Sequence, residues 1–431
     1  MKQVGFYTLG CKVSQYETEA IAENFEKHGY KISDFNEACD LYVINTCTVT
    51  AEADRKSRQI IRRAKRKSPS AKIIVCGCYS QRSPEEVLSI PDVDAVIGSS
   101  GKMELVGIAE RLLSGEGKIS NVTDIDTEPF EPMKITRGPR TRVYVKIEDG
   151  CECKCTYCAI PSARGPVRSK PREDVIREVE ELSRSGIREI VLTGIETGSY
   201  GADFREDYRL ADLLIELNER QSAEQIRLGS LAPELVGKDF VEKVKDLKIL
   251  APHFHLSIQS GSDKILRAMK RRYNRAMALE NIERIRKSIP CATFTTDIMV
   301  GFPGESDDDF CDTLDFVKEA KFLDAHVFAY SRRKNTPAES YPYQIDEATK
   351  KERSEILIGA VKDVRLSTLR DIVASKNALS CIFEEKRGKA WYGHSSTFAE
   401  VLVESDTDLN GVKKEVMPIS LDGEFIVGKL L

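Results

Sequence analysis

The sequence lacks any long apolar run and any export signal. Nowhere in its 431 residues do about 18 apolar residues follow one another, which excludes an ordinary membrane-spanning helix. The first residues, MKQVGFYTLGCKVSQ, lack the charged, apolar and small-residue zones of a signal peptide. The net charge is only −4, so no global field draws the protein onto nucleic acid. We therefore expect a cytoplasmic protein that makes no membrane contact and binds nucleic acid only through local patches.

Cysteine, by contrast, is plentiful, with twelve in the chain. In a reducing compartment, clustered cysteines are more often metal or redox ligands than disulfides. Four of them fall within the stretch GCECKCTYCAIP, residues 150–161, which is too dense for a set of scattered core residues. The cysteines are therefore the first candidates for a functional site.

The length predicts two to four domains, at about 100–200 residues each. Residues 4–113 alternate short β-rich runs with helical patterns, which is typical of parallel strand–helix–strand units. The next stretch, NVTDIDTEPFEPMKITRGPR, has prolines and turn formers but no sustained period. We predict an N-terminal parallel-sheet α/β domain over residues 1–120 and a linker over 121–140.

Alternation resumes after the linker with six candidate strands, RVYVKIED, EIVLTGI, QIRLGS, HFHLSIQ, TFTTDIMVGF and DAHVFAY. Six strand–helix units favour a partial, TIM-like (βα)6 barrel over residues 141–370, although an open sheet fits the same pattern. A long helix is expected over residues 346–374. The tail, residues 371–431, reads as short strands with glycine turns and predicts a small all-β unit.

Three cysteines in the first domain each follow a predicted strand. Cys11 comes after the first strand, Cys47 ends the second and Cys78 ends the third. Because the carboxyl ends of parallel strands share one edge of the sheet, these thiols are expected to meet there. Cys76 competes with Cys78 for the third place, but it lies inside its strand. The alternative is that all three are ordinary buried thiols.

A second triplet follows the first predicted barrel strand. Cys151, Cys155 and Cys158 are spaced as CxxxCxxC, and Cys153 falls outside that spacing. A structural zinc site would need a further cysteine or histidine pair, which is absent here. The pattern favours a [4Fe–4S] cluster held by three thiolates, which leaves one iron open to a substrate or cofactor.

CxxxCxxC with an aromatic residue, here Tyr157, before its last cysteine resembles the signature of radical S-adenosylmethionine (SAM) enzymes. A narrower resemblance, to the radical SAM methylthiotransferases, covers nearly the whole chain. It is carried by GCKVSQYETEA, VINTCTVTAEADRKSRQIIRR, CGCYSQ, GCECKCTYCAIPSARG, LTGIETGSYG, HLSIQSGSDKILRAMKRRYNR, TDIMVGFPGES and the β tail. The resemblance implies an N-terminal cluster domain, a SAM barrel and a TRAM domain. It also implies a second [4Fe–4S] cluster on Cys11, Cys47 and Cys78.

Within that family, NTCTVTAEADRKSRQIIRR most resembles the branch that acts on N6-threonylcarbamoyladenosine in tRNA. That branch converts N6-threonylcarbamoyladenosine, at position 37 beside the anticodon, to its 2-methylthio derivative. The expected partners are the anticodon stem-loop of tRNA, an electron donor such as flavodoxin or ferredoxin, and a sulfur donor. The alternatives are methylthiolation of isopentenyladenosine or of a ribosomal-protein aspartate, and a non-catalytic iron–sulfur protein that binds RNA.

Residues for SAM itself follow from the resemblance and from polar residues at strand ends. Two glycines flank a glutamate in LTGIETGSYG, where a tight turn is the alternative explanation. Polar side chains alternate along HFHLSIQ, where a satisfied buried network is the alternative. The candidates are Tyr157, Gly194, Glu196, Gly198, His255, Ser257, Gln259 and Asp297. No catalytic residue is expected beyond the cluster ligands.

Candidates for RNA contact come from basic runs. In RKSRQIIRRAKRK, residues 55–67, four arginines fall on one helix face, where a solvated amphipathic helix is the alternative. Arg333, in YSRRKNTPAES, is a candidate anchor for the substrate carboxylate, with a surface ion pair as the alternative. The acidic tail offers only a small basic and aromatic patch. The full set is Arg55, Arg58, Arg62, Arg66, Arg333, Lys389 and Trp391.

Overall fold

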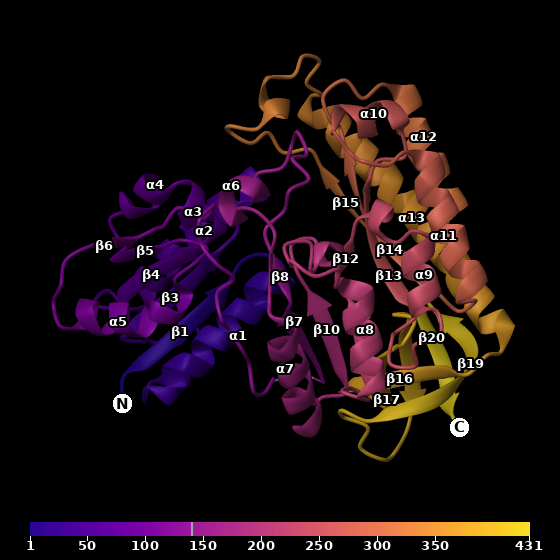
Figure 1. Cartoon of the computed structure of the whole chain (residues 1–431), viewed down its shortest axis with the longest axis horizontal. Helices are drawn as coiled ribbons and strands as arrows, with labels where there is room; N and C mark the ends of the chain where they lie inside the picture. The colour runs from indigo at the N-terminus through magenta and orange to yellow at the C-terminus, as the bar shows by residue number, and fades with distance from the viewer. Residues whose placement is uncertain (139–140) are drawn as a thin grey trace.

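The structure is a computed structural model that describes residues 1–138 and 141–431, so the last two residues of the predicted linker lie outside it. Three units follow one another along the chain, and Figure 1 shows them in indigo to purple, magenta to orange, and yellow. In the described ranges, no helix is both long and apolar enough to cross a membrane.

The N-terminal unit is a six-stranded, wholly parallel sheet in the order β2-β1-β3-β4-β5-β6. One face packs a core that includes Phe25 and Leu112, and the other packs a core that includes Tyr42 and Ile61. The strands are β1 (Gln3–Thr8), β2 (Lys31–Ser33), β3 (Leu41–Thr46), β4 (Lys72–Gly77), β5 (Ala95–Ile97) and β6 (Ile119–Asn121). The helices are α1 (Lys12–Lys27), α2 (Ala51–Lys67), α3 (Cys78–Arg82), α4 (Pro84–Leu88) and α5 (Leu105–Leu113), with the 3₁₀ turn η1 (Lys102–Glu104).

The segment expected to be a linker is packed rather than free. Met133 and Ile135 are buried in the core of the second unit. Tyr16 of α1 donates a 2.6 Å hydrogen bond to the carbonyl of Met133. Glu23 of α1 accepts a 2.9 Å hydrogen bond from the backbone N–H of Thr136. The described part of this segment therefore fastens the first unit to the second.

The second unit contains the six predicted strands, and all of its ladders are parallel except that of a two-stranded β8–β9 ribbon. The ladders form two sheets, β11-β10-β7 and β12-β13-β14-β15, which together make a partial barrel and confirm the predicted fold class. The strands are β7 (Arg142–Lys146), β8 (Glu148–Asp149), β9 (Arg168–Ser169), β10 (Glu189–Thr193), β11 (Gln225–Leu228), β12 (Ser230–Leu231), β13 (His253–Gln259), β14 (Thr293–Val300) and β15 (Asp324–Ala329).

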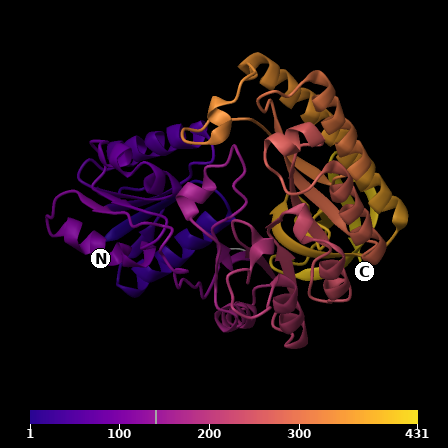
Figure 2. The ribbon, with the colours of Figure 1, turned by 45° about the horizontal axis from the view of Figure 1, so that its top comes forward.

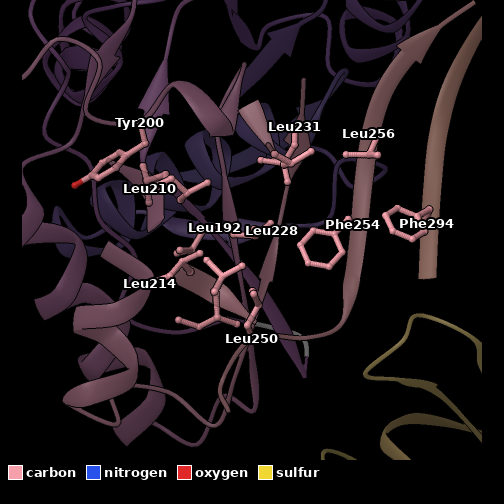
Figure 3. Close-up of a cluster of buried hydrophobic side chains, with 14 of the residues drawn as sticks. Leu192, Tyr200, Leu210, Leu214, Leu228, Leu231, Leu250, Phe254, Leu256 and Phe294 are labelled. Carbon is pink, nitrogen blue, oxygen red and sulfur yellow. The ribbon is translucent and has the colours of Figure 1, made fainter. Parts of the chain in front are cut away.

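Helices cover the outside of this partial barrel. Leucines from β10, β11 and α8 pack with Phe254 and Phe294 into the core drawn in Figure 3. The helices are α6 (Ile160–Arg164), α7 (Arg172–Arg184), α8 (Leu210–Glu219), α9 (Lys238–Val244), α10 (Asp263–Ala268), α11 (Arg275–Ser288), α12 (Asp307–Ala320) and α13 (Glu347–Ser375), with the 3₁₀ turns η2 (Thr197–Ser199), η3 (Pro233–Leu235) and η4 (Pro337–Ser340).

The C-terminal unit is a closed five-stranded barrel in the order β16-β17-β18-β20-β19, as a TRAM-like unit would be. Its Phe398 stacks on His253, at the start of β13, with ring centroids 4.5 Å apart. The carbonyl of Ser396 accepts a 3.0 Å hydrogen bond from Arg227 of β11. This barrel therefore docks at the amino-terminal ends of the parallel strands. Its strands are β16 (Leu379–Arg387), β17 (Ala390–Ser395), β18 (Glu400–Glu404), β19 (Lys413–Asp422) and β20 (Phe425–Leu430).

Candidate active site

The first cysteine triplet lies along one edge of the N-terminal sheet. Cys11 caps the start of α1 after β1, Cys47 follows β3, and Cys78 begins α3 directly after β4. Since β1, β3 and β4 are neighbours, the chain brings the three residues together as expected. Burial raises the pKa of Cys47 to about 12, and the nearby thiols of Cys78 and Cys11 also raise it.

Gly77 and Cys76 explain how β4 presents Cys78 rather than its neighbour. Gly77 has φ +97°, and a Cβ there would lie 2.4 Å from Oδ1 of Asn45, so only glycine fits this turn. Cys76 is fully buried within the strand and packs in the N-terminal core. The fold therefore keeps Cys76 apart from the edge where Cys78 lies.

The second triplet lies in the loop after β8. Gly150 allows this loop to start, because a Cβ there would lie 1.8 Å from the carbonyl oxygen of Pro166. The loop is pinned by Thr156, whose backbone N–H and hydroxyl donate to the carbonyls of Met269 and Ala268 at 3.1 and 2.9 Å. The backbone N–H of Cys158 donates to the carbonyl of Cys155 at 3.1 Å, so the CxxC part closes into a turn.

One cavity of about 550 Å³ is lined by cysteines from both triplets. In both views the N-terminal unit stands beside the barrel, and Figure 2 shows the orange segment after β15 reaching toward it. The cysteines that line the cavity are Cys11, Cys47, Cys151, Cys153, Cys155 and Cys158. Cys78 is buried behind them, with 5% of its surface exposed.

The donor set around this cavity fits iron–sulfur clusters better than a single metal ion. Thiols are the characteristic ligands of such clusters. Within the described ranges, no three cysteine, histidine or carboxylate side chains converge closely enough to hold one ion. A four-iron cluster spreads its three thiolates more widely than a single ion does. The residues present therefore fit a cluster at each triplet.

Five of the eight SAM candidates line the cavity, namely Tyr157, Glu196, Ser257, Gln259 and Asp297. Burial raises the pKa of Glu196 to about 8, and its Oε1 accepts a 2.9 Å hydrogen bond from the N–H of Ala232. Asp297 lies 3.2 Å from Nε2 of His255. The lining therefore combines the carboxylate of Asp297 with uncharged hydrogen-bonding groups and is suited to a polar, cationic ligand.

The remaining SAM candidates stand behind this lining. His255 accepts or donates at Thr295 Oγ1, 2.9 Å from its Nδ1, and so orients toward Asp297. A Cβ on Gly194 would lie 2.3 Å from Oε2 of Glu148, and one on Gly198 would lie 2.7 Å from Leu235. Close packing, rather than a left-handed turn, therefore explains the two glycines.

Several groups that the fold brings to the cavity were not among the candidates chosen from the sequence. Arg271 donates to Cys155 Sγ at 3.3 Å and to the carbonyl of Ser257 at 2.9 Å. His326 and Phe328, on β15, stack with ring centroids 5.4 Å apart and line the cavity. Alternation along DAHVFAY could have indicated the two aromatic residues, because they share one strand face. Arg271 lies in a second basic run, KILRAMKRRYNR, residues 264–275, whose charge pattern does not distinguish it from its neighbours.

The RNA candidates separate into paired and unpaired groups. Arg55 pairs with Glu52 at 2.5 Å, and Arg58 donates to Tyr79 Oη at 2.8 Å. In the part of the chain that the structure describes, the exposed Arg62 and Arg66 have no such partner. The helix that carries them, α2, starts at the cavity mouth, because Val49 and Thr50 belong to the cavity lining.

The other three RNA candidates lie elsewhere. Arg333 is buried and donates at 2.7 Å to both Thr48 and Asp54. Lys389 is exposed on the C-terminal barrel. Trp391 is only 6% exposed and packs in the core of that barrel, so the expectation that it stacks on RNA is wrong. Its ring stabilises the barrel instead.

Comparisons with known proteins agree with this geometry. Residues 145–317 match the Radical SAM superfamily, and residues 3–98 match a family described as Uncharacterized protein family UPF0004. The solved radical SAM methyltransferase TsrM from Kitasatospora setae shares the fold, with a TM-score of 0.58 and 14% identity over 78% of this chain and 77% of that chain. The fold and the site define a radical SAM enzyme.

Relatives in sequence show which kind of radical SAM enzyme this is. The threonylcarbamoyladenosine tRNA methylthiotransferase MtaB of Bacillus subtilis is 38% identical over 439 residues, which cover 99% of this chain and 97% of that protein. The tRNA-2-methylthio-N(6)-dimethylallyladenosine synthase of Pelotomaculum thermopropionicum is 33% identical over 431 residues, covering 98% of this chain and 96% of that protein. The chain belongs to the MtaB family of methylthiotransferases.

Proposed function

We propose that this enzyme converts N6-threonylcarbamoyladenosine at position 37, in the anticodon stem-loop of tRNA, to its 2-methylthio derivative. One observation carries the proposal: cysteines from two triplets, on two different domains, face a single cavity. A reaction that both transfers sulfur and activates a C–H bond needs two such centres within reach of one substrate. The relatives of the MtaB family give the substrate class.

Each triplet is assigned one cofactor. Cys151, Cys155 and Cys158 would hold the [4Fe–4S] cluster that binds SAM, and Cys11, Cys47 and Cys78 would hold the auxiliary cluster. When bound, the two clusters and SAM supply the electron, the radical chemistry and the sulfur that methylthiolation of an unactivated C–H bond requires. Cys76 and Cys153 are left out of both ligand sets.

The side chains around the cavity bind and orient SAM. Asp297 offers a carboxylate to its cationic groups, and Glu196, Ser257 and Gln259 offer polar contacts. Tyr157 packs edge-on to Phe302, with ring centroids 6.4 Å apart, and this contact fixes the loop that carries Cys155 and Cys158. His255 acts through Asp297, whose carboxylate it holds.

Apolar side chains exclude water from the same cavity. Ile160, Ile195, Met299 and Phe328 lie between the polar groups of the lining. A dry cavity protects a reactive radical from quenching by solvent and strengthens the electrostatic contacts to the bound cofactor. The chain's contribution to catalysis is therefore orientation and exclusion of water.

RNA is assigned to the mouth of the cavity. The exposed arginines of α2, Arg62 and Arg66, lead away from that mouth and are suited to phosphate contacts. Arg333 lies two residues from Ser331, which lines the cavity. We assign to Arg333 the binding of the carboxylate of the threonylcarbamoyl group. Lys389 would add a contact only at the C-terminal barrel.

The enzyme also requires partners that supply electrons and sulfur. We assign the electrons to a flavodoxin or ferredoxin. A separate donor supplies the sulfur. Since tRNA is the substrate, the enzyme is assigned to the cytoplasm.

Mass spectrometry of digested nucleosides tests this function. The reconstituted enzyme is incubated anaerobically with reductant, sulfide, SAM and tRNA that bears N6-threonylcarbamoyladenosine. A methylthio adduct on that nucleoside is expected, and tRNA without the threonylcarbamoyl group is the control. If 5′-deoxyadenosine accumulates while only isopentenyladenosine becomes methylthiolated, the radical chemistry stands and the assigned substrate is wrong.

A further inference from the structure

Two short helices join the cysteine triplets directly. α3 begins with Cys78, and α6 begins two residues after Cys158. An arginine on each helix donates a hydrogen bond to a residue of the other helix. Arg164 of α6 donates from Nε to Cys78 Sγ at 3.1 Å, and Arg82 of α3 donates from Nε to Ser162 Oγ at 3.0 Å. The segment that follows one cluster motif thus contacts a ligand of the other.

Arg164 is completely buried, and its guanidinium is fixed on every side. Nη1 donates to Glu17 Oε1 at 2.5 Å and to Asp149 Oδ2 at 3.1 Å. Nη2 donates to Glu17 Oε2 at 3.2 Å. Because Glu17 lies on α1 and Asp149 on β8, the arginine is held by both domains. Its Nε therefore points at Cys78 without freedom to turn away.

The buried charges around Arg164 lack one negative partner. Glu17 and Asp149 face three buried cations, because Lys102 lies 2.7 Å from Glu17 and Lys146 lies 3.1 Å from both carboxylates. Further out, Glu131 and Arg168 add one charge of each sign. One positive charge remains uncompensated in a place that water does not reach, which is costly unless an anion sits beside it. The sulfur of Cys78 is the group at that position.

We propose that Arg164 is a positioning residue for the auxiliary cluster. Its guanidinium donates a hydrogen bond to the sulfur of Cys78 and raises the reduction potential of the cluster held there. The proposal rests on the assignment of that cluster to Cys11, Cys47 and Cys78. Reduction adds one electron to the cluster, and no bond forms or breaks. A hydrogen bond to a ligand sulfur, and a cation beside it, stabilise the more negative reduced form. The same contact ties the potential of one cluster to the segment that carries the other.

Arg271 makes the corresponding contact at the other triplet, through Cys155. It is only partly buried, and it comes from the segment after α10 rather than from the N-terminal domain. The two arginines thus give each cluster its own donor. Removing either donor is expected to change one potential and not the other.

The test is an anaerobic redox titration followed by electron paramagnetic resonance (EPR). It compares wild type, Arg164→Lys and Arg82→Lys in the full chain. Lysine keeps the charge at each position but cannot reproduce the Nε contact. In R164K, the reduced-to-oxidised ratio of the auxiliary cluster at a fixed potential is expected to fall at least tenfold, which is about 59 mV for one electron. The SAM cluster is expected to keep its potential, and R82K to behave as wild type.

An unchanged auxiliary potential in R164K, or an equal shift in R82K, overturns the proposal. A second measurement needs no change at Arg164. Protein labelled with ¹⁵N-arginine, in which Cys151, Cys155 and Cys158 are all alanine, holds only the auxiliary cluster. Pulsed EPR of its reduced form is expected to show an arginine nitrogen coupled to that cluster. No coupling refutes the role of Arg164, and no cluster in this variant refutes the ligand assignment itself.

Discussion

The carboxylate of Asp54 and the guanidinium of Arg333 lie 2.7 Å apart, although 279 residues separate them in the chain. Asp54 belongs to the first turn of α2, and Arg333 to the loop after β15, so the pair joins the N-terminal domain to the rim of the barrel. Oγ of Ser331 accepts a 3.1 Å hydrogen bond from the N–H of Ala51 beside it. These contacts close one side of the cavity mouth. They also raise the question of whether Arg333 is only a link between domains.

Arg333 is expected to bind the substrate in addition to its ion pair with Asp54, because its buried Nε has no hydrogen-bond partner within the described residues. Arg333→Gln should raise the KM for threonylcarbamoylated tRNA about 10- to 100-fold, as expected for a lost hydrogen bond to a charged group of about 1.5–3 kcal/mol. Steady-state kinetics with SAM in excess measure this change. Asp54→Asn is the control, since it breaks the same interdomain pair and leaves the arginine in place. Equal KM increases in both variants would show that Arg333 only links the domains.

Single substitutions of the auxiliary cysteines should separate the two halves of the reaction. Cys11→Ala, Cys47→Ala and Cys78→Ala are each expected to reduce the iron content from about eight to about four atoms per chain. Reductive cleavage of SAM to 5′-deoxyadenosine should persist, because the other triplet is untouched, while methylthiolated nucleoside is lost. Iron analysis and mass spectrometry measure the two effects. Cys76→Ala and Cys153→Ala are matched controls, and loss of a cluster in either would reassign the ligands.

The positions of the cysteines could be predicted because parallel strands place their carboxyl ends at one edge. The contacts of Arg164 and Arg271 could not, because each depends on a partner more than 80 residues away. For the same reason, the sequence does not show which arginines of α2 are free to contact RNA. Periodicity placed four on one face, but only the folded chain shows that Arg58 is engaged by Tyr79.

Very short strands and contacts between domains also could not be predicted from the sequence. Strands β2 and β6 have three residues each, too few for a period to be recognised, and they form the two edges of the N-terminal sheet. The residue on which His253 stacks could not be predicted from the sequence either. His253 shares a strand face with the cofactor candidate Ser257, yet it lies at the opposite end of β13 and stacks on Phe398. Alternation gives the face of a strand but not the depth along it.

Glu189 should make stability depend on acidic pH. Burial raises its pKa, but Arg227 and Arg142 outweigh that effect and lower it to about 2. A depressed carboxyl pKa contributes stability above the unfolded value of about 4.3, and that contribution is lost as the pH falls through about 2. Glu189→Gln is expected to cost about 3–5 kcal/mol at pH 7, because it leaves buried arginines unpaired.

Urea denaturation at pH values from 7 to 2 measures this effect. The difference between wild type and E189Q should shrink as the pH falls from 4.5 to 2, because the wild-type carboxylate becomes protonated. Glu319→Gln is the control, since Glu319 pairs with Arg275 at 2.9 Å but is 56% exposed. It should cost no more than about 1 kcal/mol at any pH. A constant difference for E189Q across the range would contradict the assigned pKa.

Phosphate contacts along α2 should appear in the salt dependence of tRNA binding. Arg62→Glu combined with Arg66→Glu is expected to weaken binding at low salt at least tenfold. Each lost phosphate contact should also lower the slope of log K against log salt by about one, hence by about two for the pair. Lys248→Glu combined with Lys287→Glu makes the same change in net charge on exposed cations of the barrel exterior, and should leave the slope unchanged. Filter binding between low and physiological salt measures both. Equal losses in the two double variants would mean that tRNA responds to overall charge, and the contact surface would then lie elsewhere than α2.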